Sequence, residues 1–351
     1  MHRAGRLWRP VAFCTGKTGP MLKSVSVLGL AAVLAVVASA CGSSSTREGF
    51  EDPNPAPSGG TVATPAPAGT IGGKQAGENP AADECQKMDI VFIVDDSGSM
   101  EQEQTNLATN FPKFISVLET FKTKSGAKLD YRVAVTTTGR DVAYTIQPPG
   151  FPAIPANEKG ANGAFENTKS CGGPKRWVDK ADSDKSSRFS CLAKVGTSGP
   201  SIEMPLESLK LSLVDRVADG TNAGFLRPDA LLAVVILTDE DDCSRRDNNF
   251  VYGGDGACET MPNVQPLADY VTMLDSAAGG PGRWATTVIA GDKACKSSFG
   301  DAAEAKRLKS FVGLAGKNGT FSSICDGDLS GSLQKALDTF DAACKSFPAV
   351  R

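Results

Sequence analysis

Three oxygen-bearing side chains spaced two residues apart, Asp95, Ser97 and Ser99, are the strongest candidates for chemistry in this sequence. Their carboxylate and hydroxyl oxygens are hard donors, which suit Mg²⁺, Ca²⁺ or Mn²⁺. Because few of these donors are charged, a bound ion would keep positive charge and an open position for a further ligand. In the alternative interpretation, the serines cap the helix that follows and Asp95 is a turn residue.

The histidine content and the charge exclude several classes of protein. The only histidine is His2, so neither a Ser-His-Asp triad nor a His-ligated zinc site is available. A metal-assisted hydrolase with clustered carboxylates is an alternative, but no base with a near-neutral pKa is identifiable, and we expect no enzyme. Residues 1–40 carry five Lys/Arg and no Asp/Glu, which leaves 32 basic against 40 acidic residues. This acidic remainder predicts no nucleic-acid partner.

Two apolar runs, residues 88–94 and 231–237, predict strands that are buried on both faces of a parallel sheet. The first directly precedes Asp95. Apolar residues at helical spacing from Leu107 to Phe121 predict a helix, which Pro112 should kink or begin. Further strands are predicted over 129–138, 284–290 and 319–324, and further helices over 201–217, 264–274, 302–314 and 330–343.

This alternation predicts an α/β fold with a doubly wound, mostly parallel sheet flanked by helices. Ligands of such sheets bind outside the carboxyl ends of the strands, where the strand order reverses. Residues 140–190 interrupt the alternation, since they are rich in Gly and Pro and contain two cysteines. We expect them to form a disulfide-pinned insertion on the surface.

The segment MDIVFIVDDSGSM, residues 88–100, resembles the first motif of the von Willebrand factor A (vWA, integrin I-like) domain. That motif is the metal-ion-dependent adhesion site (MIDAS), and the resemblance covers residues 88–344. It implies a Rossmann-like fold and two further ligands, for which Asp239 and Thr197 match, with Ser201 as the alternative to Thr197. Glu240 departs from the glycine that the family usually has there. The resemblance also implies a divalent cation and a protein or glycan partner that offers a carboxylate.

The amino-terminal region has the order of an export signal. Residues 21–40 place Lys23 before an apolar run and small residues, and Ala38–Ala40 with Cys41 resemble a bacterial lipobox. We therefore expect a signal region over 1–40, with translation starting at Met21. Cleavage would leave Cys41 as a lipidated amino terminus. The alternative is a membrane anchor that is not cleaved. Residues 41–82 are rich in Pro, Gly, Ser and Ala and predict a disordered tether, followed by a vWA-like domain over 83–351.

A lipid anchor would attach the protein to the cell envelope, most consistently the outer membrane. The segment GFLRPDALLAVVILTDEDDCS, residues 224–244, also resembles predicted vWA surface lipoproteins of delta-proteobacteria and myxobacteria. We expect an adhesion or scaffold protein. Alternatively, the metal site is structural and the 140–190 insertion binds the partner.

Eight cysteines follow Cys41, an even number that favours disulfides in an exported chain. Their proximity in the sequence predicts four pairs: Cys85–Cys344, Cys171–Cys191, Cys243–Cys258 and Cys295–Cys325.

Two further charged features invite structural interpretations. Arg227 is expected to pair with Asp229 or to cap the sheet. The acidic run over 239–242, with Asp247 and Asp255 nearby, is either a solvated loop or an additional calcium site.

Overall fold

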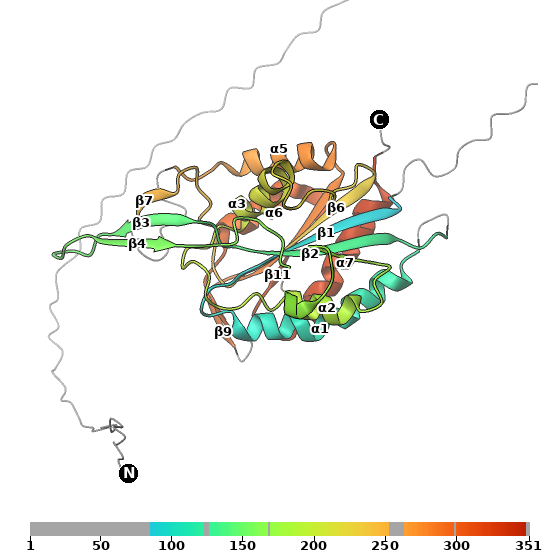
Figure 1. The fold of residues 1–351 in the computed structure, drawn as a ribbon, viewed down its shortest axis with the longest axis horizontal. Helices are drawn as coiled ribbons and strands as arrows, with labels where there is room; N and C mark the ends of the chain where they lie inside the picture. The colour runs from blue at the N-terminus through green and yellow to red at the C-terminus, as the bar shows by residue number, and fades with distance from the viewer. Residues whose placement is uncertain (1–84, 123–125, 168, 253–262, 298–299, 349–351) are drawn as a thin grey trace, which may run out of the picture. The chain divides into compact units, whose positions relative to one another are not determined.

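Six strands form the main sheet, in the order β11-β8-β6-β1-β2-β5 (Figure 1). The computed structural model describes residues 85–122, 126–167, 169–252, 263–297 and 300–348. All neighbouring strands are parallel except β5, which is antiparallel to β2. The strands are β1 (Lys87–Val94), β2 (Asp130–Thr137), β5 (Val178–Asp179), β6 (Ala230–Leu237), β8 (Trp284–Ala290) and β11 (Gly319–Ser323). The predicted doubly wound, mostly parallel α/β sheet is confirmed.

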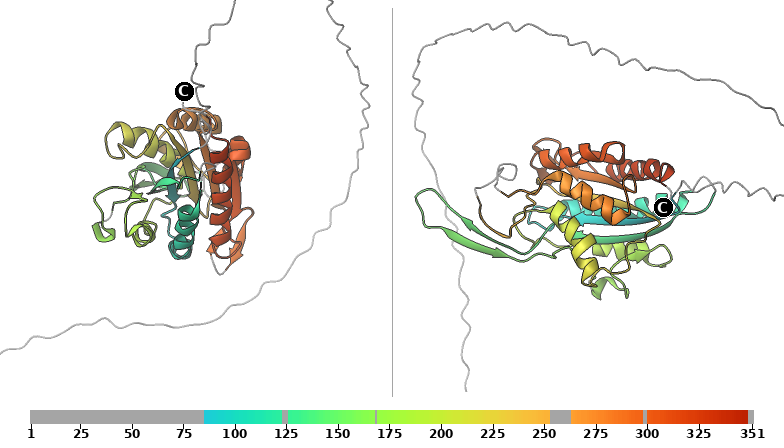
Figure 2. Two further views of the ribbon diagram at one scale, coloured as in Figure 1. Left: turned by 90° about the vertical axis from the view of Figure 1, so that its right-hand side faces the viewer. Right: turned by 90° about the horizontal axis from the view of Figure 1, so that it is seen from above.

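Helices cover both faces of this sheet (Figure 2). One face carries α1 (Glu101–Thr120), α2 (Lys185–Leu192) and α7 (Ser330–Lys345), and the other carries α3 (Pro205–Lys210), α5 (Leu267–Ala278) and α6 (Lys306–Ala315). In β1, Ile90 and Phe92 pack toward α1, whereas Val91 and Ile93 pack toward α3. Because successive side chains of a strand point to opposite faces, a strand buried on both faces appears in the sequence as one apolar run.

The helix α1 continues through Pro112, so the prediction that Pro112 begins it was wrong. A proline has no N–H to donate to the carbonyl four residues earlier, here that of Ala108. This carbonyl instead accepts a hydrogen bond of 2.9 Å from the Ser190 hydroxyl of α2. A neighbouring helix thus satisfies the acceptor that the proline leaves free.

The single helix predicted over 201–217 is three consecutive segments. It begins only at Pro205, because proline suits the first position of a helix. After α3 come a π-helical stretch (Leu211–Asp215) and the short α4 (Arg216–Ala218). Two short 3₁₀ helices, Lys169–Cys171 and Gly316–Asn318, complete the helical elements of the described residues.

Residues 140–190 are only partly a surface insertion, which corrects the prediction. Phe165, Val178 and Phe189 are fully buried, and Phe189 stacks on Phe111 of α1. The exposed part is the hairpin of β3 (Val142–Ile146) and β4 (Ile154–Glu158), which projects beyond the helices (Figures 1 and 2). Strand β3 also pairs with β7 (Asn249–Tyr252), so the hairpin belongs to a second, three-stranded sheet.

Three disulfides connect distant segments of the fold: Cys85–Cys344, Cys171–Cys191 and Cys295–Cys325. These are three of the four expected pairs. Cys258 lies outside the described residues, as do Cys41, the predicted signal region and most of the predicted tether. Within the described ranges, no helix is long and apolar enough to cross a membrane.

Candidate metal centre

The candidate site lies at the carboxyl ends of β1 and β6, where the strand order reverses. Numbered along the chain, the six strands of the main sheet run 3-2-1-4-5-6, and β1 and β6 are the central pair. The loops that follow these two strands begin side by side. The N–H of Asp95, the first residue after β1, donates to the carbonyl of Leu237, the last residue of β6, at 2.9 Å. Sheets of this order bind ligands at this point.

The loop after β1 presents two serine hydroxyls beside a buried carboxylate. Asp95 is fully buried, and its Oδ1 accepts a 2.8 Å hydrogen bond from the Ser97 N–H. The Ser97 and Ser99 hydroxyl oxygens lie 3.3 Å apart. Met100 is the N-cap residue of α1, and no side chain caps this helix. The serines therefore do not cap the helix, although the hydrogen bond from the Ser97 N–H makes Asp95 a turn residue, as that alternative also expected.

Asp239, which follows β6, adds a second buried carboxylate with an unused oxygen. Its side chain is 3% exposed, and Oδ1 has no hydrogen-bond partner among the described residues. Burial raises the pKa of Asp239 to about 7, and repulsion from Asp95, Glu240 and Glu103 adds to this, although the Ser99 hydroxyl opposes it. A buried carboxylate oxygen without a hydrogen-bond partner is a candidate ligand for a cation.

Gln104 of α1 ties the loop that contains Thr197 to the site. Its Nε2 donates to the carbonyls of Asp95 and Gly196 at 2.8 and 2.7 Å, and its Oε1 accepts from the Gly196 N–H. Thr197 follows directly, and its side chain is exposed. The hydroxyl of Ser201, the alternative ligand, instead donates to Glu158 at 2.9 Å.

Gly199 allows the loop that contains Thr197 to approach Asp96 closely. Its N–H donates to the Asp96 carbonyl at 2.8 Å, and a β-carbon at this position would lie 2.2 Å from the Asp96 carboxyl carbon. Only glycine fits there without displacement of the Asp96 side chain.

Two threonines that the sequence interpretation did not single out position Asp95. Thr238 Oγ1 donates to Asp95 Oδ2 at 2.6 Å, and Thr138 Oγ1 contacts Asp95 Oδ1 at 3.4 Å. Thr238 also accepts a hydrogen bond from the Glu240 N–H, so the turn forms with Glu240 in place of the usual glycine. Thr238 directly follows the predicted strand over 231–237, and Thr138 is the last residue of the one over 129–138. This position at a strand end is the signal that could have identified them.

Six carboxylates gather at this edge of the sheet without a compensating cation: Asp95, Asp96, Glu103, Glu203, Asp239 and Glu240. None of them forms an ion pair with Lys or Arg within the described part of the chain. Burial raises the pKa of Asp96 to about 6 and also raises that of Asp95. Burial likewise raises the pKa of Glu103 and Glu203, with repulsion from Asp95 as a further cause. The protein alone therefore stabilises these negative charges poorly.

The residues present fit a hard divalent cation held by mixed donors. Among the described residues, no three His, Cys, Asp or Glu side chains form a group that could hold a metal ion. A cation at this edge of the sheet would therefore depend on the serine hydroxyls as well as on the carboxylates. Hydroxyl and carboxylate oxygens together suit Mg²⁺, Ca²⁺ or Mn²⁺.

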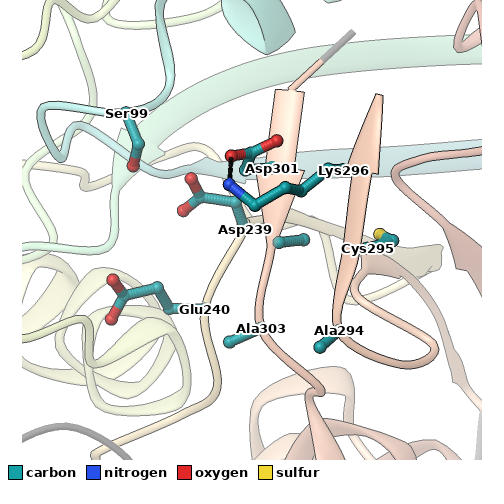
Figure 3. A pocket seen from close by; sticks show the side chains of 9 residues that line it. Ser99, Asp239, Glu240, Ala294, Cys295, Lys296, Asp301 and Ala303 are labelled. Atoms are coloured by element: carbon teal, nitrogen blue, oxygen red, sulfur yellow. Dashed lines mark hydrogen bonds and ion pairs between the residues drawn. The ribbon is translucent and has the colours of Figure 1, made fainter. Parts of the chain in front are cut away.

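An open cavity of about 590 Å³ lies beside Ser99 and Asp239 (Figure 3). Its opposite wall is the hairpin of β9 (Cys295–Ser297) and β10 (Gly300–Ala302), on which Lys296 and Asp301 form an ion pair of 2.6 Å. Three alanines of this wall, Ala294, Ala302 and Ala303, also line the cavity.

The rest of the acidic run is structural, which corrects both interpretations offered for it. Asp242 is fully buried and pairs with Arg307 at 2.7 Å. Asp241 accepts hydrogen bonds from the N–H groups of Arg307 and Leu308, at the beginning of α6. Asp247 pairs with Arg245, and Asp255 lies outside the described residues.

Comparisons with known proteins leave the family of the chain open. No protein-family model and no curated protein matches the chain. Similar solved structures include proximal thread matrix protein 1 from the mussel byssus (14% identity, TM-score 0.38), also solved with a zinc-occupied MIDAS motif (13%, 0.37). Others are the pilus adhesin SpaC from Lactobacillus rhamnosus GG (12%, 0.37) and the human COPII-coat protein Sec24c (8%, 0.38).

These matches cover 74–75% of this chain but only 49% of the mussel protein, 31% of SpaC and 33% of Sec24c. The chain thus spans less than half the length of the structures that it matches. TM-scores this low carry no inference about function, and the fold is defined by its own strand order.

Proposed function

We propose that this protein is an exported binding protein that holds a divalent cation at Asp95, Ser97, Ser99, Thr197 and Asp239. Through the cation it would bind a protein or glycan partner that offers a carboxylate, in an adhesion or scaffold role. One observation carries the proposal. The Asp239 carboxylate lies beside Ser99, and its Oδ1 atom is buried without a hydrogen-bond partner among the described residues. A bound cation would supply positive charge and an open coordination position for the partner.

The cavity beside the site gives such a partner a place to dock. It adjoins Ser99 and Asp239, so a carboxylate that enters it can reach a cation held there. The alanines of the opposite wall can pack against the aliphatic part of the incoming side chain. Lys296 and Asp301, at 2.6 Å from one another, offer the partner one charge of each sign.

We also propose that the protein is not an enzyme and that lipid at Cys41 anchors it to the cell envelope, at the outer membrane. The three disulfides of the described region support export, because such bonds persist in oxidising compartments. The lack of any histidine after His2 supports a binding role, since it removes the usual acid–base group near neutral pH. Burial does bring the pKa of Asp239 to about 7, but we assign this carboxylate to the cation and not to proton transfer.

Isothermal titration of the purified chain with Mg²⁺, Ca²⁺ and Mn²⁺ tests the metal site. We expect binding that Asp95→Ala abolishes and Thr197→Ala weakens. Ser201→Ala is the matched control and should leave affinity unchanged, because that hydroxyl binds Glu158. Pull-downs from envelope extracts should then depend on the cation. If the partner is captured equally well in the presence of chelator and by the Asp95→Ala variant, the adhesion proposal is refuted.

A second candidate function uses the β3–β4 hairpin as the binding surface and the cation only as a structural element. It is favoured by the exposure of large apolar side chains there: Phe151 is 69% exposed, Ile154 52% and Val251 of the adjoining β7 62%. Exposed apolar groups that cluster mark interaction sites. Phe151→Ser with Ile154→Ser should abolish partner capture in this case, while Asp95→Ala should not.

A further inference from the structure

We propose that Glu203 supports the cation site from outside the set of direct ligands, and that its carboxylate raises the affinity of the protein for the divalent ion. This inference rests on the proposed function and deepens it, because it adds to the site a residue that neither the motif nor its spacing indicated.

The backbone of Glu203 is fixed between the loops that surround Asp95. The Cys243 N–H donates to the Glu203 carbonyl at 2.9 Å, which connects it to the segment after β6. The next residue, Met204, donates its N–H to the Thr138 carbonyl at 3.2 Å, at the end of β2. Thr138 itself contacts Asp95. Glu203 therefore lies at the same edge of the sheet as the proposed ligands.

The side chain of Glu203 is buried without a partner for its charge. It is 1% exposed, and its Oε2 has no hydrogen bond within the described residues. Burial raises the pKa of Glu203 well above its usual range. Repulsion from Asp95 and Glu240 and a hydrogen bond with the Glu240 side chain raise it further. A buried carboxylate without a counter-charge is destabilising. A cation held beside it would remove that cost, and such groups concentrate at functional sites.

Glu207, four residues later and within α3, shows that this region can pair a buried glutamate. It is 7% exposed, yet its carboxylate accepts hydrogen bonds from Lys210 at 2.9 Å and Tyr270 at 3.0 Å, and Arg140 lies 3.6 Å away. Glu203 differs from Glu207 in that its side chain is hydrogen-bonded to another carboxylate, Glu240, and forms no ion pair with a basic residue of the described ranges.

The two glutamates should respond in opposite ways to the same substitution. Glu203→Gln removes a charge that only the cation compensates, so the metal-free protein should melt at a higher temperature. The same change should weaken Ca²⁺ and Mg²⁺ binding about tenfold or more, as loss of a supporting residue around a metal does. Glu207→Gln should lower the melting temperature and leave both affinities unchanged.

Calorimetric titration with Ca²⁺ and Mg²⁺ and thermal melting in chelator, on the full chain, test this expectation. Glu203→Met, of similar volume, serves as a second variant if the glutamine variant folds poorly. If both variants bind the ions as tightly as the parent chain does, the role of Glu203 is refuted but the proposed function is not. A parent chain that binds no divalent ion overturns the proposed function and this inference together.

Discussion

Replacement of Arg227 by Met should destabilise the fold strongly without affecting the cation site. Arg227 pairs with Asp89 at 2.7 Å and with Asp130 at 2.6 Å, whereas Asp229 pairs with Lys87. Asp89 is 1% exposed, and without the guanidinium it would keep only the Arg227 backbone N–H as donor. Removal of one member of a buried pair costs about 3–5 kcal/mol. Asp130 is 55% exposed, so its pair adds about 1 kcal/mol at most.

Chemical denaturation followed by circular dichroism measures this loss. The double variant Asp89→Leu/Arg227→Met should recover most of the stability, because it leaves no unpaired buried charge. Cation affinity of the folded variants should stay unchanged, since Asp89 lies about 20 Å along β1 from Asp95 at the usual strand rise. A loss below about 1 kcal/mol in the Arg227→Met variant would refute the reasoning.

Three further predictions concern the ends of the sheet. Replacing both Cys85 and Cys344, whose disulfide spans 259 residues, by serine should cost on the order of 5 kcal/mol in denaturant unfolding. It should cost more than loss of Cys171–Cys191, which spans 20 residues. Gln104→Leu frees the loop at Gly196 and should weaken cation binding about tenfold in calorimetric titration. Glu103 is buried with both oxygens unpartnered, so Glu103→Gln should raise the melting temperature of the metal-free protein.

The central strands were predictable because burial on both faces leaves a strong pattern. The runs over 88–94, 231–237 and 284–290 agree with β1, β6 and β8 to within one residue at each end. Shorter strands such as β5 and β9, of two and three residues, leave no such pattern. Pro112 misled the prediction of α1 because the residue that satisfies the freed carbonyl, Ser190, lies far away in the sequence.

The candidate site was predictable where a motif or a strand end marked it. Asp95 and its two serines form one short motif, and Asp239 follows a recognisable strand. Gln104 and Glu203 could not be identified, because their roles depend on contacts with segments distant in the chain. A glutamate next to an apolar helix gives no sign in the sequence that its charge is buried and unpaired.

The two ends of the sheet differ in how their charges are balanced, and this makes stability depend on the cation. At the amino ends, Arg227 and Lys87 pair with the aspartates. At the carboxyl ends, no basic residue of the described chain pairs with Asp95 or Asp239. A ligand that binds only the folded state at a hundred times its Kd stabilises it by about 2.7 kcal/mol. Chelation should therefore lower the melting temperature of the parent chain but not that of Asp95→Ala, and equal shifts in both would show that the ion acts elsewhere.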